Sequence, residues 1–90
     1  MLTQSLKRGE LSIMKIFWKR SSSISKKEII RLCNEKYKWR KSTTKILLKR
    51  LVKKRVLLKR IKFFHIYYIP IVTEKEYIKC KMNNLEPNYL

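Results

Sequence analysis

Apolar residues recur every three or four positions between residues 8 and 19, which is the spacing of one face of an α-helix. The stripe consists of Leu11, Met14, Phe17 and Trp18, and it is widened by Ile13 and Ile16. This pattern predicts an amphipathic helix over residues 8–19, after a frayed start at residues 1–6. Large aromatic side chains on such a stripe usually lie in a core, so we expect Trp18 to pack rather than to bind a ligand.

A second helix is predicted after the serine-rich turn at residues 21–23 and a short extended residue, Ile24. Ser25 and Glu28 have the spacing of a capping box, in which each side chain accepts a hydrogen bond from the other residue's backbone N–H. The predicted helix covers residues 26–36. Its core face holds Ile29, Ile30, Cys33 and Tyr37.

A third helix is predicted over residues 41–54, after a basic connector at residues 36–41 that carries Trp39. One face is apolar and consists of Thr44, Leu47, Leu48, Leu51 and Val52. The other face carries hydroxyl and basic side chains, namely Ser42, Thr43, Lys45, Lys49, Arg50 and Lys53. A helix of this kind can lie on a core and face an anion at the same time. We expect it to lie in a DNA groove.

The period changes after Arg55, where β-branched and aromatic residues become frequent. Two antiparallel strands are predicted over residues 56–62 and 65–69, and Pro70 ends the second. The turn at residues 63–64 contains no Gly, Asn or Asp, so its composition is poor for a tight hairpin. A further capping box at Thr73 predicts the start of another helix, and the last residues, 82–90, are expected to be loose.

Three short helices followed by a ribbon predict a winged helix-turn-helix fold, mainly α with a wing of two or three strands. In this layout the third helix reads the major groove and the ribbon lies along the backbone. We expect one winged-helix DNA-binding domain over residues 6–72. Residues 73–90 are expected to begin a C-terminal helix that is truncated or loose.

The charge of the chain supports an anionic partner. Lys and Arg number 24 against 6 Asp and Glu, which gives a formal net charge of +18. No acid occurs between Glu35 and Glu74, and 13 Lys or Arg lie between Lys36 and Lys62. A patch of one sign this large attracts polyanions and gives them a salt-dependent affinity. The simpler alternative is a solvated basic surface that reflects only a Lys-rich composition.

The sequence offers little for catalysis or metal binding. Cys33 and Cys80 are far apart and His65 is the only histidine, so no disulfide framework, metal site, cofactor site or catalytic residue is expected, and the chain is not expected to be an enzyme. The N-terminus lacks the apolar segment of a signal peptide. The longest uncharged run, residues 63–73, is too short to cross a membrane. We therefore expect a cytoplasmic protein with no membrane partner.

Beyond these patterns, the chain resembles a known family over roughly residues 6–78. It is similar to the bacterial penicillinase-repressor, methicillin-resistance-repressor and copper-transport-repressor family of winged-helix regulators. The matching residues are Glu10-Leu11-x-Ile13-Met14-x-x-x-Trp18, Ser25-x-x-Glu28-Ile29, Trp39-x-x-x-Thr43-x-Lys45-x-Leu47-Leu48-x-Arg50-Leu51-Val52-Lys53-Lys54, Tyr67-Tyr68-x-Pro70 and Glu74-x-Glu76. The resemblance implies a homodimeric repressor that binds a palindromic operator in double-stranded DNA, and so associates with the nucleoid when bound.

The resemblance also implies which residues contact DNA. On the third helix these are Ser42, Thr43, Lys45, Ile46, Lys49, Arg50 and Lys53, where Ile46 replaces a Thr common in the family. On the wing, phosphate contact rests on Lys59, Arg60 and Lys62, because the usual polar or Gly-bearing turn is replaced by Lys62-Phe63-Phe64-His65. The exposed phenylalanines could instead form an apolar patch or a packing contact.

Two further departures concern the end of the third helix and the C-terminus. Arg55 stands where the family usually has Gly, so the turn into the first long strand is expected to be strained. The family's C-terminal dimerisation region, with its proteolytic site and the clustered cysteines of the copper-sensing members, is largely missing. We therefore expect weak, salt-sensitive binding to one half-site. We expect no induction, either by proteolysis or by copper sensing.

Two other classes of protein remain open from the sequence. One is a non-specific basic module associated with RNA or the ribosome, whose aromatics would stack on bases. The other is a basic amphipathic peptide that acts on anionic membranes. The membrane reading fails if Trp18, Leu47, Leu51 and Tyr68 are buried together in a core.

Overall fold

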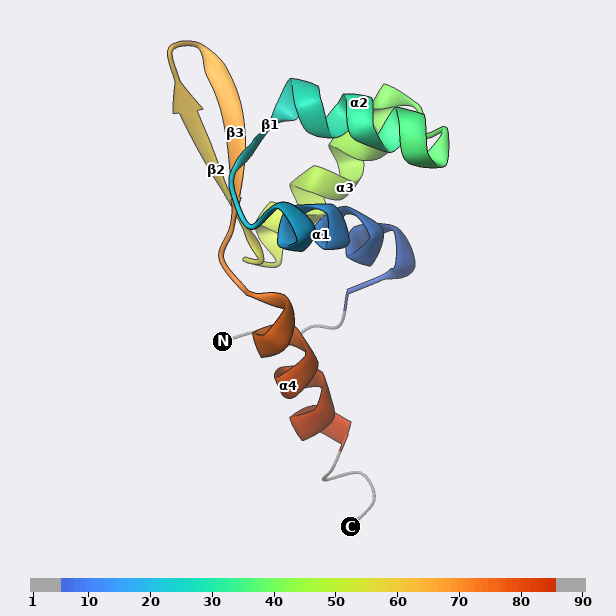
Figure 1. Ribbon diagram of the computed structural model, residues 1–90, viewed down its shortest axis with the longest axis vertical. Coiled ribbons are helices and arrows are strands. Elements are labelled where there is room, and N and C mark those ends of the chain that lie inside the picture. Colours follow the sequence, from blue (N-terminus) through green and yellow to red (C-terminus); the bar gives the residue numbers. More distant parts are fainter. Residues whose placement is uncertain (1–5, 86–90) are drawn as a thin grey trace.

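The wing and the first three helices form one unit, and a fourth helix extends away from it (Figure 1). The computed structural model describes the backbone of residues 6–85 and the side chains of residues 6–80. In chain order the elements are α1 (Arg8–Arg20), β1 (Ile24–Ser25), α2 (Lys26–Tyr37), α3 (Lys41–Lys53), β2 (Leu57–Lys62), β3 (His65–Pro70) and α4 (Glu74–Leu85). The predicted winged helix-turn-helix fold is confirmed, and α1, α2 and α3 begin and end within one residue of the predicted bounds.

The sheet has three antiparallel strands in the order β1-β3-β2. Leu57 pairs with Pro70 at the base of the hairpin and Lys62 pairs with His65 at its tip. The short strand β1 adds to the other edge of β3, with Ile24 opposite Tyr68. Because β1 leads directly into α2, this pairing fixes the start of α2 beside the wing.

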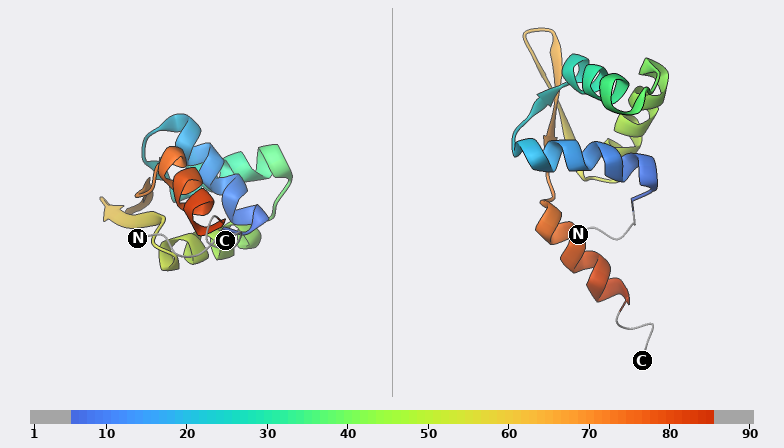
Figure 2. Two further views of the ribbon diagram at one scale, coloured as in Figure 1. Left: turned by 90° about the horizontal axis from the view of Figure 1, so that it is seen from below. Right: turned by 45° about the vertical axis from the view of Figure 1, so that its right-hand side comes forward.

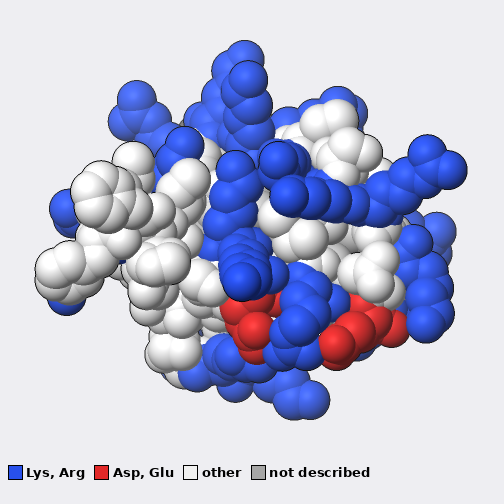
Figure 3. Space-filling view, turned by 90° about the horizontal axis from the view of Figure 1, so that it is seen from above, with Lys and Arg blue, Asp and Glu red and all other residues white. Residues whose placement is uncertain are grey.

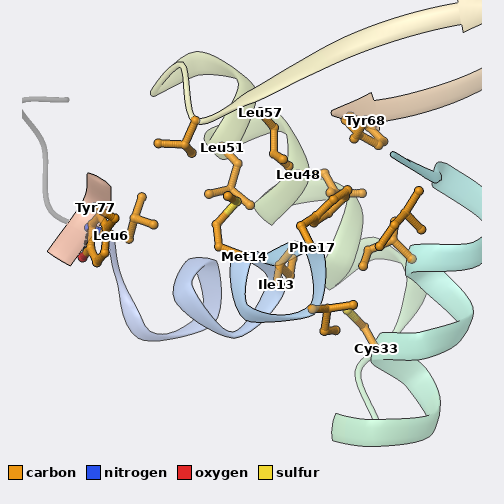
Figure 4. Close-up of a cluster of buried hydrophobic side chains, with 14 residues drawn as sticks. Leu6, Ile13, Met14, Phe17, Cys33, Leu48, Leu51, Leu57, Tyr68 and Tyr77 are labelled. Atoms are coloured by element: carbon orange, nitrogen blue, oxygen red, sulfur yellow. Dashed lines mark hydrogen bonds between the residues drawn. The ribbon is translucent and has the colours of Figure 1, made fainter. Parts of the chain in front are cut away.

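The core lies between the apolar faces of the helices and the base of the sheet (Figure 4). Phe17, Leu48 and Leu51 are fully buried, and Tyr68 is only 4% exposed. Trp18 and Leu47 are partly buried and pack against this cluster. Trp18, Leu47, Leu51 and Tyr68 therefore belong to one folded core. A basic peptide that acts on membranes would instead present them on one exposed helix face.

The first turns of α4 are attached to α1. The indole Nε1–H of Trp18 donates to the Val72 carbonyl oxygen at 2.7 Å, and the rings of Trp18 and Tyr77 lie 5.7 Å apart. The hydroxyl of Tyr77 accepts from the Leu6 N–H at 3.3 Å. Beyond this attachment α4 extends away from the other elements (Figure 2).

These contacts correct two predictions at the ends of the chain. Leu6 does not fray, since it is buried and bonded to Tyr77; residues 1–5 lie outside the described residues. The loose tail expected from residue 82 is wrong as far as Leu85, because α4 continues to that residue. Residues 86–90 also lie outside the described part of the chain.

Within residues 6–85, left-handed backbone occurs at five non-glycine residues: Ser21, Lys38, Arg55, Phe63 and Phe64. Arg55, with φ of 64°, follows α3, so the strain predicted for this turn is confirmed. The only glycine of the sequence, Gly9, lies instead in α1. A Cβ there would meet Leu47 Cδ1 at 3.1 Å, so Gly9 allows α1 and α3 to approach closely.

Candidate nucleic-acid interface

The helix α3 is held on the core by one face and exposes the other. Thr44, Leu48 and Leu51 are fully buried, which fixes the rotation of the helix about its axis. All seven α3 residues expected to contact DNA are exposed: Ser42, Thr43, Lys45, Ile46, Lys49, Arg50 and Lys53. Ile46 is 54% exposed, so this face combines hydroxyl, basic and apolar groups.

The turn between α2 and α3 is fixed by aromatic and amide contacts. Lys38 ends α2 in a left-handed conformation with φ of 60°. The side-chain amide of Asn34 donates to the Trp39 carbonyl oxygen at 3.0 Å, and the rings of Tyr37 and Trp39 lie 4.8 Å apart. These contacts set the angle at which α3 leaves α2, and so the direction in which its exposed face points.

The other end of α3 is tied to α1 by an ion pair. Lys54 Nζ donates to Oε1 of the fully buried Glu10 at 2.6 Å, and the Lys7 N–H donates to the same oxygen at 2.8 Å. Burial by itself raises the pKa of this carboxyl, but the hydrogen bonds from Lys54 and Lys7 and the charge of Arg50 hold the pKa below its ordinary value. Glu10 therefore stays ionised inside the core.

The basic residues of the wing are divided between its two faces. Lys59 lies opposite the buried Tyr68 in the ladder, whereas Arg60 and Lys62 lie opposite Tyr67 and His65. Because side chains alternate along a strand, Lys59 is on the face that the sheet turns toward the helices, and Arg60 and Lys62 are on the outer face. All three are exposed, but they do not form one row.

A hollow of about 660 Å³ lies between the starts of α2 and α3 and the wing tip. Four lysines line it, and we call it the lysine hollow: Lys26, Lys27, Lys41 and Lys45. Phe64 lines the same hollow from the wing. Partial burial lowers the pKa of Lys26, and the charges of Lys45, Lys59 and Lys41 lower it further. These cations are therefore close enough to repel one another.

Sequence reasoning missed Lys26, Lys27 and Lys41 as candidate contacts. In the sequence, Lys26 and Lys27 belong to the capping box that begins α2, and Lys41 begins α3. The spacing of residues does not indicate that the starts of these two helices lie close together. The pairing of β1 with β3 brings them together, and a strand of two residues leaves almost no signal in a sequence.

Among the described acids, Glu10 pairs with Lys54 at the end of α3, whereas Glu28 and Glu35 lie on α2. Glu28 and Glu35 pair with Arg31 on α2, at 2.7 Å each, and Glu28 also pairs with Arg20 at 3.3 Å. Seen from the wing side, Lys and Arg spread across the face, and the few acids lie among them in the lower part of the view (Figure 3). An uncharged lobe lies beside this basic face, where the hairpin ends.

Neither a membrane span nor a metal centre is found in the described residues. No helix there is long and apolar enough to cross a membrane, and no group of His, Cys, Asp and Glu side chains is arranged to hold a metal ion. Cys33 is fully buried, and burial raises the pKa of its thiol, so it belongs to the core.

A third helix with an exposed basic face, beside a basic hairpin, is the arrangement of a winged helix-turn-helix domain that binds nucleic acid. Residues 6–90 match the penicillinase repressor family. The chain belongs to this family, as its sequence predicted. A curated relative, the penicillinase repressor of Bacillus licheniformis, is 33% identical over 76 residues, which cover 84% of this chain and 59% of the relative.

Two solved structures share the fold. The solution structure of the DNA-binding domain of the repressor BlaI matches with a TM-score of 0.75 at 31% identity, covering 86% of this chain and 92% of that one. The Bacillus licheniformis BlaI monomeric form in complex with the blaP half-operator matches with a TM-score of 0.70, with the same identity and coverage. This chain spans 59% of the length of the curated relative.

Proposed function

We propose that this chain is a sequence-specific DNA-binding repressor that occupies a promoter operator. The observation that carries the proposal is the exposed face of α3, where hydroxyl and basic side chains lie beside the lysine hollow and the helix itself contains no acid. Family membership supports the same activity, and BlaI, which shares this fold, binds the blaP half-operator. Such a protein acts in the bacterial cytoplasm and performs no catalysis.

The residues of α3 divide by the chemistry of their side chains. Residues near the start of a recognition helix reach base edges, so we assign base contact to Ser42, Thr43, Lys45 and Ile46. Hydroxyls and Lys bond to bases, and the methyl groups of Thr43 and Ile46 suit the methyl group of thymine. Phosphate contact is assigned to Lys49, Arg50, Lys53, Lys59, Arg60 and Lys62.

The lysine hollow adds a third region to these contacts. Lys26, Lys27 and Lys41 extend the basic surface from α3 onto the start of α2. A phosphate backbone that leaves the groove beside α3 would meet them, and each neutralised phosphate adds to the affinity by releasing counterions.

We assign DNA binding to residues 6–72 and regard α4 as the beginning of a C-terminal region. By family resemblance two copies bind a palindromic operator, one on each half-site. Two linked half-sites bind far more tightly than one. Because BlaI in monomeric form binds a half-operator, we expect a single copy of this chain to bind a half-site weakly.

The test is binding of the 90-residue chain to a duplex recovered by selection from a random-sequence pool. A scrambled duplex of the same composition serves as control, and both are titrated by gel shift at two salt concentrations. We expect at least about tenfold preference for the selected duplex, retained when salt weakens both. Equal affinity for the two duplexes at each salt concentration would refute sequence-specific repression.

The second candidate is a non-specific module that binds RNA. Phe63 and Phe64 favour it, because they are 80% and 101% exposed and could stack on unpaired bases. A single-stranded RNA of the same length belongs in the same titration. Tighter binding to the RNA than to the selected duplex would favour this second candidate.

A further inference from the structure

The wing ends in two adjacent phenylalanines, Phe63 and Phe64, at the turn between β2 and β3. Phe64 is fully exposed and Phe63 is 80% exposed, whereas the base of the same hairpin is buried at Leu57 and Tyr68. Both have positive φ, 51° for Phe63 and 65° for Phe64, as a type I′ turn requires. This turn favours Asn-Gly, and a bulky residue with positive φ is rare.

Backbone strain alone does not mark the wing tip. Ser21, Lys38 and Arg55 are also left-handed without being glycine. Those three have polar side chains that water solvates, however, whereas the phenylalanines expose aromatic rings in the same strained conformation. Strain and exposure of apolar surface coincide only at residues 63–64 among these positions, so these two rings are good candidates for a binding contact.

The surroundings of the two rings are cationic. Lys62 Nζ lies 5.7 Å from the centre of the Phe63 ring, and Phe64 lines the lysine hollow together with Lys41 and Lys45. No acid lies between Glu35 and Glu74 in the sequence, so α3 and the wing contain none. An aromatic wing tip beside the lysine hollow is complementary to a ligand that has phosphates and flat apolar rings.

The wing tip and the start of α3 also face the same side. Phe64 from the hairpin and Lys41 and Lys45 from the first turns of α3 line one hollow. Figure 3 shows the uncharged lobe of the hairpin next to the basic face on that side. A duplex that accepts the start of α3 in its major groove therefore meets the wing tip where the backbone leads into the next groove.

We propose that Phe63 and Phe64 form an apolar wedge that enters the minor groove and partly unstacks one base step beside the α3 site. The inference rests on the proposed function, since α3 must first place the wing on duplex DNA. Other minor-groove proteins insert Phe or Leu between base steps in this way and kink the duplex. The lysine hollow then holds the phosphate strand that borders the opened step.

A membrane surface suits the wing less well. Membrane-bound amphipathic elements present a broad apolar face with cations along its borders. Here the most exposed apolar side chains, Phe63, Phe64 and Ile61, lie at the outer end of one hairpin, and the cations form a hollow on one side of it. Anionic vesicles therefore serve as a comparison ligand in the experiment.

The test uses the selected duplex with 2-aminopurine placed at successive adenines, because the fluorescence of this base rises when it unstacks. We expect the unaltered chain to raise the fluorescence at one step outside the α3 footprint. The double variant F63N/F64G creates the preferred turn sequence and so preserves the fold. We expect it to abolish the rise and to weaken binding about tenfold, while the dependence on salt stays the same.

Two further variants separate a wedge from a loss of apolar surface in general. F63L/F64L keeps a wedge-forming side chain, so it should retain most of the fluorescence rise. Ile71→Ser removes an apolar side chain that is 51% exposed at the base of the hairpin, where the Ile71 N–H donates to the Val56 carbonyl oxygen, and it should bind as the unaltered chain does. Thermal unfolding of each variant shows that the fold is intact.

The outcomes distinguish this inference from the proposed function. If the chain prefers the selected duplex but F63N/F64G binds it and raises fluorescence as before, the wedge is wrong and the repressor stands. If the chain binds no duplex, both the wedge and the proposed repressor function are wrong. The same holds if it binds anionic vesicles or a single strand more tightly than any duplex.

Discussion

The ammonium group of Lys54, one residue beyond α3, lies 2.6 Å from the carboxylate of Glu10 in α1, which is fully buried. The two residues are 44 positions apart in sequence. The pair joins the end of the proposed recognition helix to the first helix, and an unpaired charge at this depth would be strongly unfavourable. It therefore acts as a fixed point for the position of α3.

Removal of the cation should destabilise the domain severely. In Lys54→Met the buried carboxylate of Glu10 loses its charged partner, so we expect a loss of about 3 kcal/mol in the free energy of unfolding. The double variant E10Q/K54M buries no charge and should be more stable than K54M alone. Urea denaturation of the three proteins measures this. A double variant that is less stable than K54M would contradict the importance of the pair.

The same carboxylate should make stability depend on pH. Because the pKa of Glu10 is lower in the folded protein than its ordinary value of 4.5, the ionised form favours folding. This contribution is complete above about pH 4.5 and is lost as the pH falls further toward the folded pKa. The stability advantage of the unaltered chain over Glu10→Gln should therefore shrink between pH 5 and pH 3. An advantage that stays constant over about these pH values would show that the carboxyl is not held ionised.

The turn after α3 should be open to stabilisation. Arg55 has φ of 64°, a conformation that glycine adopts without strain. We expect Arg55→Gly to raise the free energy of unfolding by about 1 kcal/mol, after the greater flexibility of glycine in the unfolded chain is subtracted. Chemical denaturation would measure the gain. Ser21→Ala, which keeps the left-handed position but adds no freedom, is a control that should give no such gain.

Arg50 should contribute to DNA binding more than to folding. It is exposed on α3, so Arg50→Ala leaves the buried face of the helix unchanged. We expect weaker binding to the selected duplex and a reduction of about one in the slope of log affinity against log salt, as for one lost phosphate contact. Circular dichroism melting checks the fold. Unchanged affinity at low salt would remove Arg50 from the proposed contacts.

Lys26 tests whether the lysine hollow belongs to the interface. Replacement by Gln should weaken binding to the selected and scrambled duplexes equally, since phosphate contacts carry no sequence information. Lys19, which lines a different hollow between α1 and α2, offers the matched control. If K19Q and K26Q weaken binding by the same factor, only the overall charge matters and the hollow has no specific part.

Periodicity predicted the three main helices because each carries a strong apolar stripe. It also identified Thr44 as a core position despite its hydroxyl, and Thr44 is fully buried. The left-handed Arg55 was predictable as well, because the family resemblance showed where a glycine is usual. Each of these features depends on a single helix or turn, so the local pattern, or for Arg55 the family resemblance, was enough to predict it.

Features that depend on pairing between distant segments were not predicted. The three wing cations were grouped together, but the register puts Lys59 on one face and Arg60 and Lys62 on the other. The lysine hollow requires the pairing of Ile24 with Tyr68, which brings α2 beside the wing. The ion pair between Glu10 and Lys54 joins two helices whose separate patterns give no sign of it.

The attachment of α4 has a consequence for how two copies could read DNA together. Trp18 donates a hydrogen bond to the Val72 carbonyl oxygen and packs on Tyr77. These contacts fix the orientation of the first turns of α4 relative to α1. In a homodimer joined through the C-terminal region, that orientation would set the distance and rotation between the two recognition helices. The contacts of one tryptophan would then help to determine the length of the spacer between operator half-sites.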